Sequence, residues 1–524
     1  MQGKARLVGV MLMAVGPVFA QSPEDEPLSA IDWLSESVEQ PATVNIPLMG
    51  PDFGSRSTRT PPANEPPVAG NATTPNVSVQ ALGNPAPQAL GLLPASTTGL
   101  PADLWVGSEL DTLTALIQAE RIDTLPALNN LLKLLVLTTA DAPAEGPNAG
   151  AFFLARVDKL LDFGALEPAQ AMLEAAGPDT PDNFRRWFDV SLLTGTETTA
   201  CRALRNKPAV APTAAVRVFC LARSGDWNAA ALTLNTSAVL GDIDADMADL
   251  LARFLDPDLF EGEPPLAAPA RTSPLVFRMR EAIGQPLTTQ NLPRAFSHAD
   301  LRANVGWKAQ LEAAERLAAV GAIDENTLIG IYTGRVPAAS GGVWERAKAV
   351  RQLDAALAVA DPDALAAALE RVWTEANSAG VIVPLARFYG PALLAADVAP
   401  TGRAVQFRML LLSNAYEAAA LNDTLAATDP FLAAVAKGDP AQTRATQPRY
   451  VHVRNAFAAE PEASLLEMAS QRRIGEAILR TIATIEQGIA DDQVSFSEGI
   501  ATLRALGLED AARRTALQYL LLEG

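Results

Sequence analysis

From residue 108 onward, apolar side chains recur at spacings of three and four along the chain. Leu110, Leu113 and Ile117 form one such face, and residues 128–136 (LNNLLKLLV) carry another. This period is that of an amphipathic helix, and runs of β-branched residues that alternate with period two are missing. The pattern therefore predicts an all-α protein in which most of the chain beyond residue 100 is helical. Continuous helices are predicted over residues 401–421 and 462–487.

Short breaks that contain Gly or Pro separate these helical stretches. Connections of that length place consecutive helices side by side and antiparallel. The strongest interior break is EGEPPLAAPART at residues 261–272, which we interpret as a linker at a domain boundary or as a long crossover. It divides the helical part into an N-terminal region, 101–260, and a C-terminal region, 273–524.

Three turns share one pattern of small residues. Each ends a helix at Gly and places Ala five positions later, and the turns are LLDFGALEPAQAML (160–173, with Ala169), CLARSGDWNAAALTL (220–234, with Ala230) and TLRALGLEDAARRTAL (502–517, with Ala512). Gly supplies the left-handed turn, and Ala lets two helix axes approach closely. In this turn chemistry the chain resembles the helix-turn-helix unit of tetratricopeptide-like repeat proteins, without that family's Trp, Tyr and Pro consensus. The resemblance implies an α-solenoid of stacked antiparallel hairpins; an irregular helical bundle is the alternative.

The first twenty residues have the order of a secretory signal peptide. Lys4 and Arg6 precede an apolar run over residues 7–15, and Val18-Phe19-Ala20 offers small residues at the cleavage positions. We predict cleavage after Ala20 and export to the periplasm of a bacterial envelope. Since no later stretch is apolar over the length of a bilayer span, we expect a protein that is not membrane-embedded.

Residues 21–100 are rich in Pro, Ser, Thr, Asn and Gly. Such a segment buries too little apolar surface to offset the entropy of ordering it, so we predict a disordered tether. Its last part, residues 77–105, carries many Leu residues, and we expect this part to lie as an extended strap on the first helices.

A short amphipathic island interrupts the tether near its start. Ile31, Leu34 and Val38 share one helical face beside Trp33. A helix this short is marginal in water, so it needs a surface on which to dock. These four residues are our candidate docking residues, and three alternatives stay open: a partner groove, the chain's own domain, or no fixed structure.

The chain is strongly acidic. It has 60 Asp and Glu against 41 Lys and Arg, a net charge of −19, which becomes −21 when Lys4 and Arg6 leave with the signal peptide. Binding of nucleic acid requires a concentrated basic face that displaces counterions. The charge therefore argues against nucleic acid as a partner.

Cys201 and Cys220 are the only two cysteines. An exported chain meets an oxidising compartment, where two thiols usually pair. If the helices before and after Pro208 and Pro212 fold back on each other, the two thiols come close enough for a disulfide. We predict this disulfide, with two buried free thiols as the alternative; a catalytic thiol is disfavoured because no nearby histidine could activate it.

The sequence contains no recognisable catalytic, cofactor-binding or metal-binding site. His298 and His452 are the only histidines, and neither a Cys-x-x-Cys nor a His-x-x-x-His spacing is present. No nucleophile elbow and no phosphate-binding glycine loop is found. We therefore predict no metal and no cofactor.

A stacked-hairpin body acts through binding more often than through chemistry. We therefore expect a periplasmic scaffold that binds envelope proteins or peptides, as a monomer or as a homo-oligomer. The alternative is an envelope enzyme that acts on glycan with carboxylates in a helical cavity. A pair of convergent acids with raised pKa values would favour the enzyme, whereas a groove with arginine and aromatic anchors such as Trp307, Trp344 and Trp373 would favour the scaffold.

Overall fold

The structure is a computed structural model that describes residues 33–34, 87–143, 150–490 and 493–522. Over these ranges the chain forms 26 α-helices and no β-strand, so the all-α prediction is confirmed. None of the helices in the described part is long and apolar enough to cross a membrane. The predicted signal peptide, residues 1–20, and most of the predicted tether, residues 21–100, lie outside the described residues.

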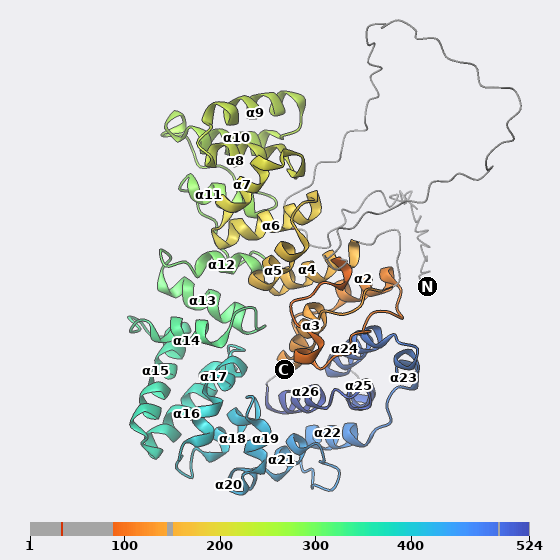
Figure 1. Cartoon of the computed structure of the whole chain (residues 1–524). Coiled ribbons are helices and arrows are strands. Elements are labelled where there is room, and N and C mark those ends of the chain that lie inside the picture. The colour runs from red at the N-terminus through yellow and green to blue at the C-terminus, as the bar shows by residue number, and fades with distance from the viewer. Residues whose placement is uncertain (1–32, 35–86, 144–149, 491–492, 523–524) are drawn as a thin grey trace, which may run out of the picture.

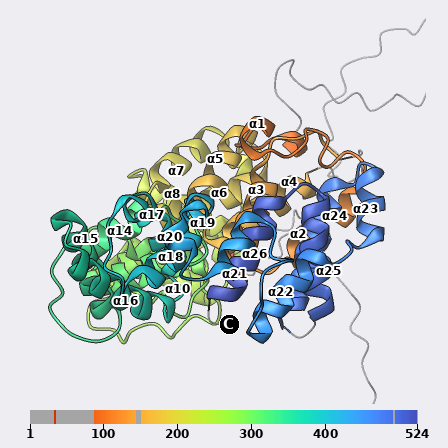
Figure 2. The ribbon, with the colours of Figure 1, turned by 90° about the horizontal axis from the view of Figure 1, so that it is seen from below.

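Most of the helices form a ring that closes on itself (Figures 1 and 2). The ring starts with α2 to α4, continues from α12 to α26, and returns until α24 and α26 pack on α2 and α3. Its helices are α2 (Leu110–Ala119), α3 (Pro126–Leu137), α4 (Ala151–Phe163), α12 (Ser297–Asp300), α13 (Trp307–Ala318), α14 (Glu325–Thr333), α15 (Val343–Val359), α16 (Pro362–Asn377), α17 (Ile382–Ala395), α18 (Arg403–Leu411), α19 (Tyr416–Leu421), α20 (Asp423–Ala426), α21 (Pro430–Lys437), α22 (Pro448–Ala458), α23 (Ala463–Ser470), α24 (Ile474–Ala490), α25 (Gln493–Ala505) and α26 (Glu509–Leu521).

The remaining long helices form an arm that rises from the ring between α4 and α12 (Figure 1). The segment 261–272 is a crossover in this arm, because it brings the chain from α10 back to α11, which packs on α6. The arm contains α5 (Leu166–Ala176), α6 (Pro181–Thr194), α7 (Glu197–Asn206), α8 (Ala214–Arg223), α9 (Trp227–Leu240), α10 (Ala245–Leu255) and α11 (Pro274–Ala282).

Segments from the two ends of the described chain hold the ring closed. Gln518 Oε1 of α26 accepts a hydrogen bond from the backbone N–H of Ala127 in α3, at 2.7 Å. The N–H of Gly475, in α24, donates to the carbonyl of Leu104 at 2.9 Å. A Cβ at Gly475 would overlap the Trp105 ring, so only glycine lets the two segments approach this closely.

Residues 87–105 lie across the first helices of the ring, as predicted for the strap. Contrary to the expectation of an extended strap, they are not extended throughout, because they form the 3-10 helix Pro87–Ala89 and α1 (Ala95–Thr98). The backbone N–H groups of Leu92 and Leu93 both donate to the carbonyl of Leu137, at the end of α3. The fully buried guanidinium of Arg156 ties the strap to α3, since it donates to Leu90 O at 2.7 Å and to Val136 O at 2.9 Å. The strap is confirmed for these residues; positions 77–86 are not described.

The pattern of small residues in the three turns is confirmed. Their glycines, Gly164, Gly225 and Gly507, have φ angles of 76°, 84° and 81°. The alanines five positions later, Ala169, Ala230 and Ala512, have no exposed surface. Each turn therefore uses a left-handed glycine and a close helix contact.

Two helices that the apolar spacing predicts as continuous are broken. The helix expected over 462–487 is divided into α23 and α24 at Arg472, whose φ is 65° and whose carbonyl accepts from Gly107 N–H at 3.1 Å. The helix expected over 401–421 is divided into α18 and α19 at Ser413, whose hydroxyl donates to Leu410 O and accepts from Ala415 N–H. In both places a local or distant polar contact overrides the periodicity.

Cys201 in α7 and Cys220 in α8 lie at disulfide distance, with their Cα atoms 5.0 Å apart. The two helices are consecutive in the arm and are joined through the Pro208–Val210 turn. The geometry therefore supports the predicted disulfide, which would hold these two helices of the arm together.

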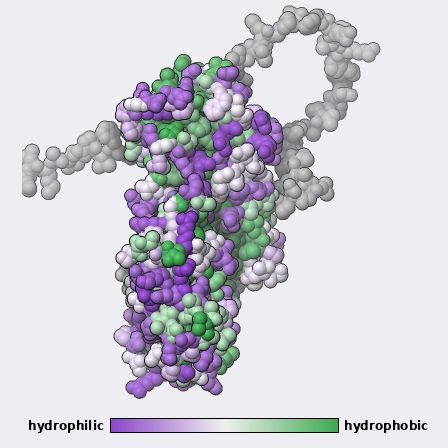
Figure 3. All heavy atoms as spheres, turned by 90° about the vertical axis from the view of Figure 1, so that its left-hand side faces the viewer, coloured by the Kyte–Doolittle hydropathy of each residue, from purple (hydrophilic) through white to green (hydrophobic). Residues whose placement is uncertain are grey.

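The arm ends at α9, a helix that is uncharged and leaves several apolar side chains exposed. None of its fourteen residues, WNAAALTLNTSAVL, is charged. Trp227 is 51% exposed, Leu232 69% and Val239 88%. Hydrophobic residues accordingly appear at the upper end of the molecule in Figure 3, the end where Figure 1 places α9.

Candidate functional site: a groove and a junction cavity

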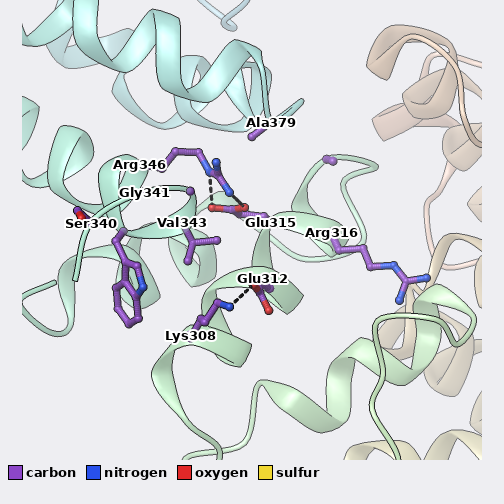
Figure 4. A pocket seen from close by; sticks show the side chains of 12 residues that line it. Lys308, Glu312, Glu315, Arg316, Ser340, Gly341, Val343, Arg346 and Ala379 are labelled. Atoms are coloured by element: carbon purple, nitrogen blue, oxygen red, sulfur yellow. Dashed lines mark hydrogen bonds and ion pairs between the residues drawn. The ribbon is translucent and has the colours of Figure 1, made fainter. Parts of the chain in front are cut away.

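An open groove of about 590 Å³ lies between α13 and the start of α15 (Figure 4). We call it the groove. Its walls come from α13, from the loop and first turn of α15, and from the turn that precedes α17; the lining residues are Lys308, Glu312, Glu315, Arg316, Ala319, Ser340, Gly341, Gly342, Val343, Trp344, Arg346 and Ala379.

The loop at the rim of the groove depends on two glycines. Gly341 and Gly342 have φ angles of 86° and 53°, in the left-handed region that side chains with a Cβ rarely adopt. A Cβ at either position would meet no atom within 4 Å. Backbone conformation, rather than crowding, therefore accounts for glycine here, and the loop leaves the groove open.

The ionic groups inside the groove neutralise one another. Arg346 donates from Nε and Nη2 to the two carboxylate oxygens of Glu315, at 2.7 and 2.6 Å. Tyr332 O–H donates to the same carboxylate at 2.7 Å, and burial together with Glu315 raises the pKa of Tyr332 well above its usual value. Lys308 pairs with Glu312 at 3.4 Å. Figure 4 shows both ion pairs within the groove.

Of the three tryptophans expected as anchors, the structure places one in the groove. Trp344 lines it and remains partly exposed, with its ring centroid 5.2 Å from that of Trp307. Trp307 is buried, and its indole N–H donates to Ile331 O. The Trp307 ring is therefore held in place and forms a surface on which Trp344 packs. Trp373 lies elsewhere, beneath the guanidinium of Arg408.

Arg316 belongs to the lining but is turned away from the ion pairs (Figure 4). It donates to the carbonyls of Thr289 and Leu292, at 3.0 and 2.5 Å. Burial, and then the nearby Arg294, lower its pKa. Its role here is to hold the 289–292 segment against α13.

A second cavity, of about 470 Å³, lies where distant parts of the ring meet. We call it the junction cavity. Its lining comes from the α2–α3 turn, the α13–α14 turn, the α16–α17 turn and α24; the residues are Arg121, Ile122, Asp123, Thr124, Leu125, Pro126, Arg294, Ala319, Val320, Asn377, Gly380, Ile382, Val383, Glu486, Ile489, Ala490 and Leu522. Ala319, at the end of α13, lines both cavities.

Two carboxyl groups with raised pKa values lie beside the junction cavity. Glu120, at the end of α2, is 6% exposed, and burial together with the neighbouring Glu486 raises its pKa to about 8. Burial also raises the pKa of Glu486. One side-chain oxygen of each residue, Oε2 of Glu120 and Oε1 of Glu486, is buried without a hydrogen-bond partner. A proton on Glu120 at neutral pH removes the repulsion between the two groups.

Two lysines stabilise the surroundings of the junction cavity by donating to backbone carbonyls. Lys159 Nζ donates to Glu120 O at 2.7 Å and to Asp162 Oδ2 at 3.0 Å. Lys133 Nζ donates to Gly321 O at 2.7 Å. Gly321 lies just beyond the C-terminus of α13, where a cation interacts favourably with the helix dipole. Burial and then Arg387 lower the pKa of Lys133 to about 8.

Both histidines have structural contacts. His298 Nε2 is 2.6 Å from Gly164 O, and burial lowers the pKa of this imidazole. His452 Nδ1 lies 3.1 Å from the Tyr519 hydroxyl, and its Nε2 lies 3.0 Å from Gln493 O. Over the part of the chain that the structure describes, no group of three metal-binding side chains is found.

The candidate docking residues are described only in part. Trp33 and Leu34 are 7% and 1% exposed, buried against the chain's own domain, which was one of the three alternatives. The Trp33 ring meets Phe296 edge to face at 5.6 Å, and Leu34 O accepts from Arg271 Nη2 at 3.2 Å. Ile31 and Val38 lie outside the described residues.

The sequence reasoning missed the carboxyl pair, although a signal for one member was present. Glu486 follows Ile482 by four residues and precedes Ile489 by three, so it occupies the apolar face of α24. A lone acid on such a face indicates a buried carboxyl group. Glu120 carried no such signal, because it follows the last turn of α2 and is buried only by tertiary contacts.

Comparison of the chain with protein-family models, with curated proteins and with solved structures finds no match. Function is therefore argued from the groove, the junction cavity and the chemistry of their residues.

Proposed function

We propose that this protein is exported to the bacterial periplasm, with its leader cleaved after Ala20, and acts there as a helical-repeat, tetratricopeptide-like scaffold. In this proposal the groove binds peptide segments of other envelope proteins. The cysteine pair at disulfide distance supports the compartment, because such pairs persist in oxidising surroundings.

The observation that carries the binding role is the chemistry of the groove. It is open, it presents Trp344 on a rigid aromatic support, and its Glu315–Arg346 and Lys308–Glu312 pairs are already closed. Paired charges have little drive to take part in proton transfer, whereas a supported aromatic ring is a common anchor in protein interfaces. The ligand that fits is a peptide that packs an apolar side chain on Trp344.

Site-specific photo-crosslinking tests this role. A photoreactive residue at Ser340, on the rim of the groove, should form a covalent adduct with one protein in intact cells. The same residue at Val359, which is 75% exposed and outside the groove, serves as the control position. Trp344→Ala should abolish the Ser340 adduct, whereas Trp373→Ala should retain it. A Ser340 adduct that persists in Trp344→Ala would refute the proposed mode of binding.

The carboxyl pair favours a second candidate, an envelope enzyme that acts on glycan. Glu120 and Glu486 have raised pKa values, and Glu486 lines the junction cavity. A protonated carboxyl group beside a second acid is the arrangement that glycoside hydrolysis uses. Under this candidate, the proton that Glu120 holds would reach the leaving group through Glu486, the carboxyl group that lines the cavity.

Release of reducing ends from peptidoglycan tests the second candidate. Activity of the wild type that falls at least about 100-fold in Glu486→Gln would support it, because removal of a general acid has an effect of that order. Glu312→Gln, in the groove, is the matched control. If the wild type releases no reducing ends, the second candidate is refuted.

A further inference from the structure

Trp33 and Leu34 are buried although they are far from the rest of the described chain in sequence. The next described residue is Pro87, so residues 35–86 separate this pair from the strap. Their burial is nonetheless nearly complete, with Leu34 1% exposed. The pair is thus held by its own contacts with the helical domain.

The surface that receives the pair lies at the base of the arm. Phe296 belongs to the 3-10 helix Arg294–Phe296, and Phe277 belongs to α11; their rings meet edge to face at 5.4 Å. Trp33 adds a third ring to this cluster, edge to face with Phe296. Edge-to-face contacts between aromatic rings favour a defined orientation of the incoming side chain.

Main-chain recognition accompanies the aromatic contact. Arg271, in the crossover before α11, donates from Nη2 to the carbonyl of Leu34 at 3.2 Å. A pocket for one side chain together with a hydrogen bond to the backbone is how proteins commonly bind short linear peptides. The sequence around the pair is SAIDWLSESV.

We propose that Arg271, Phe277 and Phe296 form a peptide-binding site whose ligand is a Trp-Leu segment, and that the chain fills this site reversibly with its own Trp33 and Leu34. The site is separate from the groove around Trp344, so a test of this site does not decide the proposed function of the groove. A covalently attached segment has a high local concentration, and it therefore excludes free peptides of the same sequence until it is released.

Fluorescence anisotropy with a labelled synthetic peptide tests the site. The probe is SAIDWLSESV, residues 29–38, and the protein is the full chain produced with its own leader. Trp33→Ala/Leu34→Ala should bind the probe at least about tenfold more tightly than the wild type, because the competing internal segment is lost. Arg271→Ala in the same background should weaken binding, and a probe with Ala in place of Trp should not bind.

The melting temperature of the double variant provides a second readout. If the probe occupies the vacated site, it should restore part of the thermal stability that the two substitutions remove. A folded double variant that does not bind the probe would overturn the proposal. Equal binding to the wild type and the double variant would also overturn it, because the probe would then bind elsewhere.

A wild-type measurement covers the case in which the double variant does not fold. A protease site inserted between residues 35 and 86 allows the segment to be cut from its tether. After cleavage, an excess of labelled probe should exchange with the bound fragment. Failure to exchange would show that Trp33 and Leu34 are a permanent part of the core, and would overturn the proposal.

Discussion

The ring and the arm are built from similar helices but are stabilised in different ways. In the ring, Ala127 and Gln518, which are 391 positions apart, share a hydrogen bond, and α24 and α26 pack on α2 and α3. In the arm, α5 to α10 pack mainly on their neighbours in sequence, whereas α11 returns to pack on α6. The outermost helix, α9, leaves Leu232 and Val239 exposed. The ring therefore depends on contacts between distant segments, whereas most contacts in the arm join helices that are consecutive in the chain.

Among variants that still fold, the largest effect at neutral pH is expected where the arm meets the ring. Asp158 of α4 and Arg186 of α6 form a buried pair with two hydrogen bonds, at 2.5 and 2.7 Å. Asp158→Ala leaves a buried guanidinium without its main partner and should cost about 3–5 kcal/mol of unfolding free energy. Asp162→Ala, which removes a half-exposed partner of Lys159, should cost about 0–1 kcal/mol in the same denaturation experiment. Equal losses in the two variants would contradict this account.

The cysteine pair provides the next comparison of the stability of the arm and the ring. Replacement of Cys201 and Cys220 by Ser should cost about 3 kcal/mol in the chain-entropy view, with the loss confined to the arm. Hydrogen exchange measured by mass spectrometry should be faster in α7 and α8 and unchanged in α24 to α26. If exchange rises equally in both regions, the arm and the ring unfold as one unit.

Closure of the ring can be broken at one glycine. Gly475→Ala should cost about 1–3 kcal/mol, because the added Cβ overlaps Trp105. Gly330→Ala in α14 is the matched control: a Cβ there meets no atom within 4 Å, so this change should stabilise the protein by about 0.4–1 kcal/mol. Thermal melting of both variants measures this difference in stability. A neutral Gly475→Ala would contradict the role of Gly475 in closing the ring.

The junction should respond to pH through Glu120. Its pKa is about 8 in the folded state, above the usual 4.5, so the folded protein holds a proton that the unfolded chain has released. Stability from this group is complete below pH 4.5 and is lost as pH rises through about 8. Glu120→Gln should therefore gain up to about 4 kcal/mol of stability relative to the wild type as the pH rises from 4.5 to 9. A difference between wild type and variant that does not change with pH would contradict the raised pKa.

The smallest effect is expected at the end of the arm. Val239 is 88% exposed on α9, so Val239→Lys should change the unfolding free energy by no more than about 0.5 kcal/mol. Leu517→Lys in α26 is the comparison within the ring, where Leu517 has no exposed surface and the substitution should prevent stable folding. A large loss for Val239→Lys would show that α9 is covered in solution.

Local patterns in the sequence were sufficient to predict helices but not their long-range arrangement. The spacing of Leu110, Leu113 and Ile117 predicts α2, and the left-handed turn at Gly164 follows from residue types that lie close together. The breaks at Arg472 and Ser413 were missed because a contact with Gly107 and the bonds of a single hydroxyl do not change the apolar spacing.

The candidate site was predicted even less completely, for the same physical reason. Trp344 was named as an anchor, but its place in a groove depends on α13. Another helix, α14, separates α13 from Trp344 along the chain. The junction cavity requires the α2–α3 turn and α24 to meet, and no local pattern encodes that meeting. Docking of Trp33 on Phe296 was one alternative among three, because sequence alone does not distinguish a surface on the same chain from one on a partner.

The central claim is that the groove around Trp344 binds a peptide segment of another protein. The most direct measurement is the affinity between the purified protein and the partner found by crosslinking from Ser340. The account predicts that Trp344→Ala weakens this affinity at least about tenfold while Trp373→Ala changes it by less than about twofold. Equal affinities of the wild type and Trp344→Ala would contradict the claim.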